Sequence, residues 1–246
     1  MSPASAFRSR VNQLLRRFGY EFARVQRPST MDGALRRLAQ RHDVQTIIDV
    51  GASDGRWSLL AKRHFPRSRF LLIEAQASVH EQALTALRAR HPEMEFVLAA
   101  AGDALGTTHF LGDDPFGGAA SHTPFQRGDV VVPMTTIDEE VARRGLPGPY
   151  LIKLDTHGFE KPILEGASKT LSAASLVVIE AYNFELLPGS PRFPELCQLL
   201  EGLGFRCVDI ADVMHRPADD ALWQMDLFFA PDSRPEFRDN TYSGVA

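Results

Sequence analysis

The chain has 246 residues, enough for one large domain, and the usual range of about 100–200 residues per domain argues against two full-sized ones. Hydrophobic residues make up 44% and charged residues 24%, which is typical of a globular protein and excludes a disordered, collagen-like or coiled-coil chain. The net charge of −4 argues against a general nucleic-acid binder, so no nucleic-acid partner is expected.

Residues 1–30 form a basic arm ahead of the main domain. Six arginines and one acidic residue give the first 28 residues a charge of +5. Apolar side chains recur there at helical spacing, on one stripe formed by Phe7, Val11, Leu14, Leu15, Phe18 and Phe22. We interpret this stripe as a helix packed on the main domain, with weak docking on an anionic membrane surface or a protein as the alternative. The main domain is expected over residues 31–232, and a tail over 233–246.

Residues 31–101 alternate between helical and strand patterns. In chain order we expect a helix at 31–41, a strand at 46–50, a helix at 56–64, a strand at 69–74, a helix at 78–90 and a strand at 95–101. This βαβαβ order predicts a doubly wound α/β fold, in which helices cover both faces of a parallel sheet.

The middle of the chain interrupts this alternation. Strand patterns at 107–111 and 130–134 flank a loop at 112–124 with no helix between them, which predicts a hairpin-like insertion. A short helix is expected at 138–144. Alternation then resumes with a strand at 150–154, a helix at 160–171, a strand at 176–181, a helix at 193–203 and strands at 205–210 and 222–230. The last strand follows without a helix, so we expect it to be antiparallel to its neighbour.

The location of the protein is predicted from its cysteines and its hydropathy. Cys197 and Cys207 form neither a CxxC pair nor a disulfide framework, which is typical of a reducing compartment. No run approaches the roughly 20 apolar residues of a membrane span, and the N-terminus lacks the apolar centre of a signal peptide. A cytoplasmic location is therefore expected.

The turn after the first strand, residues 49–55, has the sequence DVGASDG. A dinucleotide fold requires G-x-G-x-x-G, whose second glycine lets the backbone approach a pyrophosphate, but Ser53 stands at that position. The additional carboxylate of Asp54 favours S-adenosylmethionine, which has no phosphate and bears a sulfonium and an ammonium. The cofactor contacts expected from this turn are Asp49, Gly51, Ala52, Ser53 and Gly55.

Two further strand ends complete the predicted nucleoside site. Glu74 ends the second strand 19 positions after Gly55, close to the spacing of about 20 for a carboxylate that accepts both ribose hydroxyls. With it we group its neighbour Ala75. At the end of the third strand, Gly102 and Asp103 are expected next to the adenine. Asp103 would accept a hydrogen bond from the adenine amino group.

Two segments resemble the FkbM-type family of S-adenosylmethionine-dependent methyltransferases. They are IDVGASDGRWS at 48–58 and LIKLDTHGFEKPILEGA at 151–167. The family motif D-x-x-G-x-E followed by L-x-G-A is matched at Asp155, Gly158, Glu160, Leu164, Gly166 and Ala167. The resemblance spans about residues 45–230 and implies the class I methyltransferase fold, a Rossmann-like, seven-stranded, mostly parallel sheet. It also implies methyl transfer to oxygen, often on sugars or polyketide-type products.

The loop after residue 154 contains the candidate catalytic residues. Asp155 can reach the cofactor's ammonium or an acceptor hydroxyl. His157 is the candidate general base, because a free imidazole has a pKa of about 6.5 and is mostly neutral at neutral pH; the alternative is that it only holds the loop by hydrogen bonds. The family often has Glu at this position. Asp155, His157, Glu160 and Glu180 could instead bind a divalent cation, but no HExxH or CxxC supports this, and we expect no metal. For Glu160, capping the following helix is the preferred interpretation.

The acceptor site is expected at the same edge of the sheet. The loop at 112–124 could cover the acceptor through Phe116 and His122, and Tyr182 and Asn183 follow a strand that ends at this edge. The sequence thus predicts an S-adenosylmethionine-dependent O-methyltransferase acting on a sugar or specialised metabolite. A nicotinamide-dependent oxidoreductase is the first alternative, disfavoured by the missing second glycine and by the lack of a Tyr-x-x-x-Lys pair. A non-catalytic nucleoside-binding or scaffold module is the second.

Overall fold

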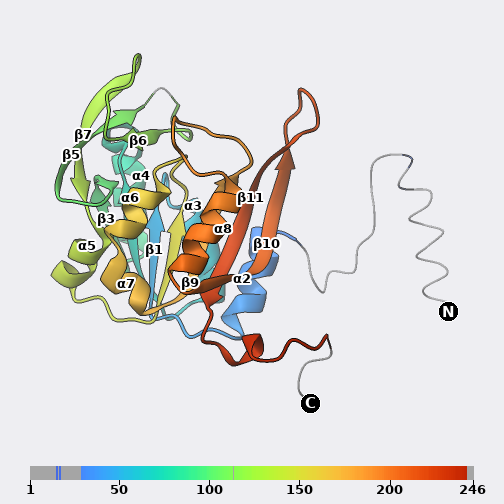
Figure 1. Ribbon diagram of the computed structural model, residues 1–246. Coiled ribbons are helices and arrows are strands. Elements are labelled where there is room, and N and C mark those ends of the chain that lie inside the picture. The colour runs from blue at the N-terminus through green and yellow to red at the C-terminus, as the bar shows by residue number, and fades with distance from the viewer. Residues whose placement is uncertain (1–14, 16, 18–28, 113, 243–246) are drawn as a thin grey trace.

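The computed structural model describes residues 15, 17, 29–112 and 114–242 of the chain (Figure 1). The helical stripe predicted for the basic arm therefore lies almost wholly outside the described residues. Within the described ranges, no helix combines the length and apolar character that a membrane crossing requires.

The body is a mixed α/β structure built on a seven-stranded sheet in the order β10-β11-β9-β8-β1-β2-β3. The strands are β1 (Thr46–Val50), β2 (Arg69–Glu74), β3 (Met94–Leu98), β8 (Tyr150–Leu154), β9 (Ala174–Tyr182), β10 (Phe205–His215) and β11 (Leu222–Pro231). The pairs from β3 through β2, β1 and β8 to β9 are parallel. As the sequence predicts, β11 is antiparallel to its neighbours, β9 and β10.

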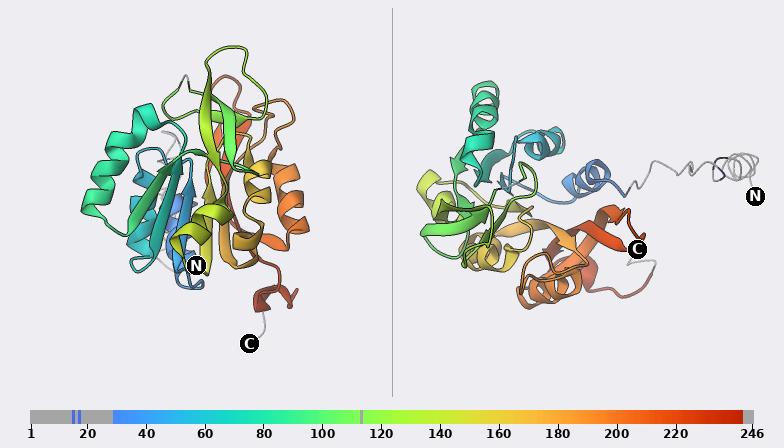
Figure 2. Two further views of the ribbon diagram at one scale, coloured as in Figure 1. Left: turned by 90° about the vertical axis from the view of Figure 1, so that its left-hand side faces the viewer. Right: turned by 90° about the horizontal axis from the view of Figure 1, so that it is seen from above.

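Helices cover both faces of this sheet, as the two views of Figure 2 show. One face packs against α2 (Met31–Ala39), α3 (Arg56–His64) and α4 (Ala77–Arg90), and the other against α5 (Ile137–Arg144), α6 (Glu160–Glu165), α7 (Ser168–Ser172) and α8 (Phe193–Gly202). Side chains alternate between the faces, so Ile47 belongs to the first core and its neighbour Ile48 to the second. Because both faces are covered, the central strands are continuous apolar runs rather than alternating ones.

The insertion forms a second, four-stranded sheet in the order β4-β7-β5-β6, at the upper left in Figure 1. Strands β5 (Gly106–Leu111) and β7 (Asp129–Thr135) are antiparallel, which confirms the expected hairpin. Two features differ from the prediction. The loop at 112–124 contains a further strand, β6 (Ala119–Ser121), and the strand expected at 95–101 divides into β3 and β4 (Ala100–Ala101), which pairs with β7 in the second sheet.

The helix expected at 160–171 is broken into α6 and α7. The break lies at Gly166, where a Cβ would come within 2.0 Å of the Gly102 carbonyl oxygen. Only glycine allows the chain to approach the end of β4 so closely. The strand predicted at 205–210 also extends further, to His215, because it continues to pair with β11 across three irregularities in register. A final 3₁₀ turn spans Pro235–Phe237.

Candidate active site

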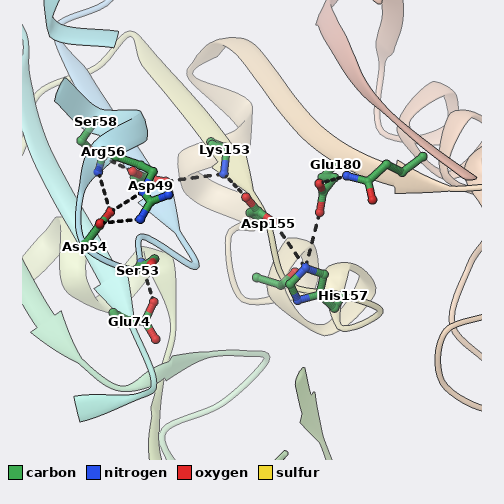
Figure 3. Close-up of polar contacts among 12 residues, drawn as sticks. Asp49, Ser53, Asp54, Arg56, Ser58, Glu74, Lys153, Asp155, His157 and Glu180 are labelled. Atoms are coloured by element: carbon green, nitrogen blue, oxygen red, sulfur yellow. Dashed lines mark hydrogen bonds and ion pairs between the residues drawn. The ribbon is translucent and has the colours of Figure 1, made fainter. Parts of the chain in front are cut away.

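The turns after β1 and β8 touch at the carboxyl ends of the parallel strands. Gly51 has a φ of +75°, and a Cβ there would lie 2.0 Å from the carbonyl oxygen of Asp155. Two requirements, a left-handed backbone and a close approach, thus demand glycine. Ser53 also has a positive φ, of 52°. This bend directs its backbone N–H to Glu74 Oε2, at 2.7 Å, as drawn in Figure 3.

Glu74 is buried at the end of β2 with both carboxylate oxygens held in place. Its Oε1 accepts the backbone N–H of Gln76 at 2.8 Å, while Oε2 accepts that of Ser53. Each carboxylate oxygen has about two lone-pair sites, so both can accept a further hydrogen bond from a ligand. The side chain is therefore oriented for a donor pair such as a diol.

Asp49 occupies a different environment from the one predicted. Its side chain is fully buried beneath the turn, Oδ2 accepts the hydroxyl of Ser58 at 2.7 Å, and it does not line the cavity. Burial raises the pKa of Asp49, although Lys153 Nζ lies 4.0 Å from its Oδ1. Gly55 is also outside the lining, because it begins α3 and faces the side chain of Leu87. Both residues shape the turn from behind.

A lysine that sequence reasoning missed lies at the centre of the site. Lys153 is 4% exposed, and its Nζ donates to Asp155 Oδ2 at 2.6 Å. Burial would lower the pKa of Lys153, but the charges of Asp155 and Asp49 raise it above its usual value. Burial likewise opposes ionisation of Asp155, yet Lys153 and neighbouring groups hold its pKa at about 2. The signal for this pair was a lysine in the otherwise apolar strand YLIKL.

His157 is held in an unusual backbone conformation, with a φ of +54°. Its Nδ1 lies 2.9 Å from the carbonyl oxygen of Gly118 in the insertion. Its Nε2 lies 3.6 Å from Asp155 Oδ1 and 3.5 Å from Glu180 Oε2 (Figure 3). A left-handed conformation at a residue other than glycine costs about 1–3 kcal/mol and is concentrated at functional sites. The histidine thus joins β8, β9 and the insertion.

The surroundings of His157 make it a cation. Burial would lower its pKa, but hydrogen bonding to Glu180 and to the Gly118 carbonyl, together with the charge of Asp155, raises the pKa to about 9. The sequence led us to expect a mostly neutral imidazole at neutral pH; the resting site holds an imidazolium instead. The sequence could not reveal this, because Asp155 follows β8 and Glu180 lies on β9, and the two carboxylates meet His157 only in the folded protein. The role of His157 as a base remains a prediction.

Asp155, His157 and Glu180 each offer a possible metal-ligand atom, and these atoms lie within 4.8 Å of one another. In the described part of the chain this is the one such group of side chains. Their donors and acceptors are already matched. Glu180 Oε2 accepts the hydroxyl of Tyr182 at 2.5 Å, and Oε1 accepts the amide of Gln224. The arrangement is that of an ion-pair network.

Glu160 stands apart from this network. It is 2% exposed, and its Oε1 accepts the backbone N–H of Gly158 at 2.9 Å and the hydroxyl of Thr156 at 3.3 Å. Burial raises the pKa of Glu160. Glu160 is the first residue of α6, but both of these hydrogen bonds go to the loop ahead of the helix, and the helix-capping interpretation stays a prediction.

One cavity lies over these turns. Of the predicted residues, its lining includes Gly51, Ala52, Ser53, Glu74, Ala75, Phe116, Asp155 and His157. Outside the lining lie Asp49, Gly55, Gly102, Asp103, His122, Tyr182 and Asn183. Lining residues that the sequence reasoning missed include Arg56, Trp57, Gln76, Phe110, Gly118, Lys153 and Phe159. The structure therefore brings Glu74 and Asp155 to one cavity and leaves Asp103 outside its lining.

Asp103 is exposed at the end of β4, where its Oδ1 lies 3.3 Å from His122 Nε2. Gln76, by contrast, lines the cavity and is buried, at 8% exposed. Its Nε2 donates to the Asp114 carbonyl at 2.9 Å, and its Oε1 has no hydrogen-bond partner. Gln76 thus offers an acceptor to a ligand. No motif signalled it, because its position depends on the insertion.

The insertion covers the cavity through Phe110, Pro115, Phe116, Gly118 and Ala120. His80 of α4 bonds the Pro115 carbonyl at 2.8 Å, and the Arg56 guanidinium lies 4.8 Å from the centre of the Phe116 ring. These contacts, together with that between His157 and Gly118, fix the insertion against both ends of the cavity.

Tyr182 and Asn183 lie beyond His157. The Tyr182 ring centre is 5.9 Å from that of His157 and 5.8 Å from that of Trp223. Asn183 donates its amide to the Leu222 carbonyl at 3.2 Å. Tyr182 is therefore next to the ion-pair network, while Asn183 joins the ends of β9 and β11.

The model of the family described as "Methyltransferase FkbM domain" matches residues 49–207. Among solved structures, a putative O-methyltransferase from Klebsiella pneumoniae is 15% identical, with 94% of this chain and 90% of that chain covered and a TM-score of 0.47. The O-methyltransferase TomG from Streptomyces achromogenes, solved with SAM, is 13% identical, with coverage of 91% and 88% and a TM-score of 0.47. LaPhzM is 16% identical at a TM-score of 0.40, and the match covers 81% of this chain but only 56% of LaPhzM. No curated protein matches.

Proposed function

This chain belongs to the FkbM-domain methyltransferases, and we propose that it transfers the methyl group of S-adenosylmethionine to a hydroxyl oxygen of a sugar or specialised metabolite. The activity is assigned to residues 31–232, outside the basic arm and the tail. The strand order β3-β2-β1-β8-β9-β11-β10, with β11 antiparallel to its neighbours, supports assignment to the class I methyltransferase fold.

The observation that carries this proposal is the charge of the cavity. Its lining cations are all committed: Lys153 to Asp155, Arg56 to Asp54 at 2.7 Å, and His157 to two carboxylates. Within the described part of the chain, the lining therefore offers no unpaired cation for a pyrophosphate. Its lining carboxylates are Glu74, which is held by two backbone N–H groups, and Asp155, which is paired with Lys153 and His157. This pattern fits a phosphate-free nucleoside with positive charge.

The residues present fit S-adenosylmethionine in three places. Glu74 would accept the ribose hydroxyls, since both its oxygens are already oriented by backbone N–H groups. Gln76 Oε1, an orphaned acceptor, would meet a donor on the nucleoside. Asp155, kept ionised by Lys153, would attract the methionine ammonium and the sulfonium. The cofactor supplies a methyl group on a positively charged sulfur.

The acceptor would enter from the side of His157 and Tyr182, beneath the insertion. Methyl transfer is an in-line displacement, so the protein's main tasks are to align the oxygen with the methyl group and to exclude water. Phe110, Phe116 and Phe159 line the cavity with apolar surface suited to excluding water. We propose Phe116, His122, Tyr182 and Asn183 as acceptor contacts, with Tyr182 next to His157 and Phe116 at the other end of the cavity against Arg56, and a small molecule or glycan as the acceptor.

Titration calorimetry with S-adenosylmethionine, S-adenosylhomocysteine and NAD tests this function. We expect both sulfur nucleosides to bind, with a micromolar dissociation constant for the homocysteine product, and NAD not to bind. NAD binding without the sulfur nucleosides would favour an oxidoreductase. Binding without transfer of a labelled methyl group to any of a panel of hydroxylated sugars and polyketides would favour a non-catalytic module.

A further inference from the structure

Both ring nitrogens of His157 face only acceptors. Nδ1 lies 2.9 Å from a carbonyl oxygen, so Nδ1 bears a hydrogen. Nε2 lies 3.6 and 3.5 Å from one oxygen each of Asp155 and Glu180, at ion-pair distance. Nδ1 is therefore a hydrogen-bond donor, and the two carboxylates at Nε2 favour a proton there too. The positive ring stands beside the same carboxylate, Asp155, that a cationic ligand would meet.

We propose that His157 gives up its Nε2 proton when the sulfonium cofactor binds beside Asp155, and regains a proton from the acceptor hydroxyl during methyl transfer. This inference rests on the proposed function. His157 then becomes neutral, and able to deprotonate an acceptor, only when the methyl donor is bound.

The charges around His157 support this exchange. Asp155 faces it from the end of β8, Glu180 and Tyr182 from β9, and Glu160 acts on it from α6, while Lys153 and Asp226 act on Asp155. Both carboxylates at Nε2 are already bonded, Glu180 by Tyr182 and Gln224 and Asp155 by Lys153, but of the two only Asp155 lines the cavity and can meet a new cation there. A charge within about 4–6 Å changes a pKa by about 1–3. A second positive charge there would bring the pKa of His157 from about 9 to between about 6 and 8.

The step balances in atoms and charge. The acceptor oxygen forms a bond to the methyl carbon, the bond between carbon and sulfur breaks, and its electron pair remains on sulfur. The hydroxyl proton goes to Nε2 of His157. The positive charge thus moves from sulfur to imidazole, so the buried site ends with the charge with which it began. The product nucleoside has a neutral sulfur and no longer competes with the imidazolium for Asp155.

Proton release on binding measures this directly. Calorimetry at pH 7.0 in buffers of different ionisation enthalpy gives the number of protons released per ligand. We expect release of up to about 0.9 proton for S-adenosylmethionine and less for S-adenosylhomocysteine, which keeps the ammonium near Asp155 but lacks the sulfonium. His157→Gln should bind S-adenosylmethionine without releasing the proton. His215→Gln, at an exposed position on β10, should release it like the wild type.

A second measurement needs no variant. In the wild-type protein, the affinity for S-adenosylmethionine should rise between pH 6.5 and 7.5 by several-fold, because binding expels a proton, while the affinity for S-adenosylhomocysteine should change little. Binding of S-adenosylmethionine with no proton release, or release that persists in His157→Gln, overturns the inference and leaves the proposed function intact. Absence of binding by either nucleoside overturns the proposed function itself.

Discussion

Lys153 and Asp155 form a buried ion pair at the end of β8, with 2.6 Å between Nζ and Oδ2. Two positions apart in the chain, they lie on the same face of the strand end. The pair leaves Asp155 Oδ1 directed to His157 and the cavity. One carboxylate is thereby shared between Lys153 and His157, and its pKa is held at about 2 despite its burial.

Lys153→Met should destabilise the protein strongly. Removing one partner of a buried pair leaves an uncompensated charge, a change that costs about 3–5 kcal/mol. Urea denaturation measures the loss in free energy of unfolding, and Lys161→Met, at an exposed position on α6, is the matched control. A stability of Lys153→Met equal to that of the control would mean that the ion pair contributes nothing.

Glu74→Gln should weaken the binding of S-adenosylhomocysteine about 10- to 100-fold, because hydrogen bonds to a charged group contribute about 1.5–3 kcal/mol. The amide also replaces one acceptor with a donor, opposite a backbone N–H of Ser53 or Gln76. Glu81→Gln, exposed on α4, serves as the control in the same calorimetric titration. If Glu74→Gln bound as tightly as Glu81→Gln, the ribose assignment would be wrong.

Asp226→Asn should stabilise the protein at high pH. Burial, only partly offset by Lys153, and the charges of Glu180 and Asp155 raise the pKa of Asp226 to about 7. An acid whose pKa is raised on folding contributes stability below its unfolded pKa of about 3.9, and this is lost as the pH rises through about 7. The asparagine variant does not titrate. The melting temperature of the variant minus that of the wild type should therefore be several degrees larger at pH 8.5 than at pH 5.

The exposed Asp43 supplies the comparison for that measurement, as Asp43→Asn should show the same difference from wild type at both pH values. An effect of Asp226→Asn that is equal at pH 5 and pH 8.5 would show that Asp226 titrates normally in the folded protein.

Local patterns were sufficient for the positions of the sheet strands and for one side of the site. Strand β8 was predicted with its observed bounds, because five consecutive buried positions bounded by turn residues give a clear signal. The same holds for the turn that begins at Gly51 and for Glu74, since both lie at ends of parallel strands, where ligands bind in such sheets. The sequence could not place Asp103 correctly with respect to the cavity, because β4 leaves the main sheet to pair with β7.

The amino-acid sequence alone determined the α/β order, the hairpin insertion and the identity of the acidic residues near the cavity, because each depends on neighbours within a few positions. Tertiary structure decided which groups surround His157, the isolation of Asp49 from the cavity and the position of Gln76 in its lining. His157 bonds Gly118 across 39 positions of sequence and meets Glu180 from another strand. A charge state set by groups so distant along the chain exists only after the two sheets have packed together.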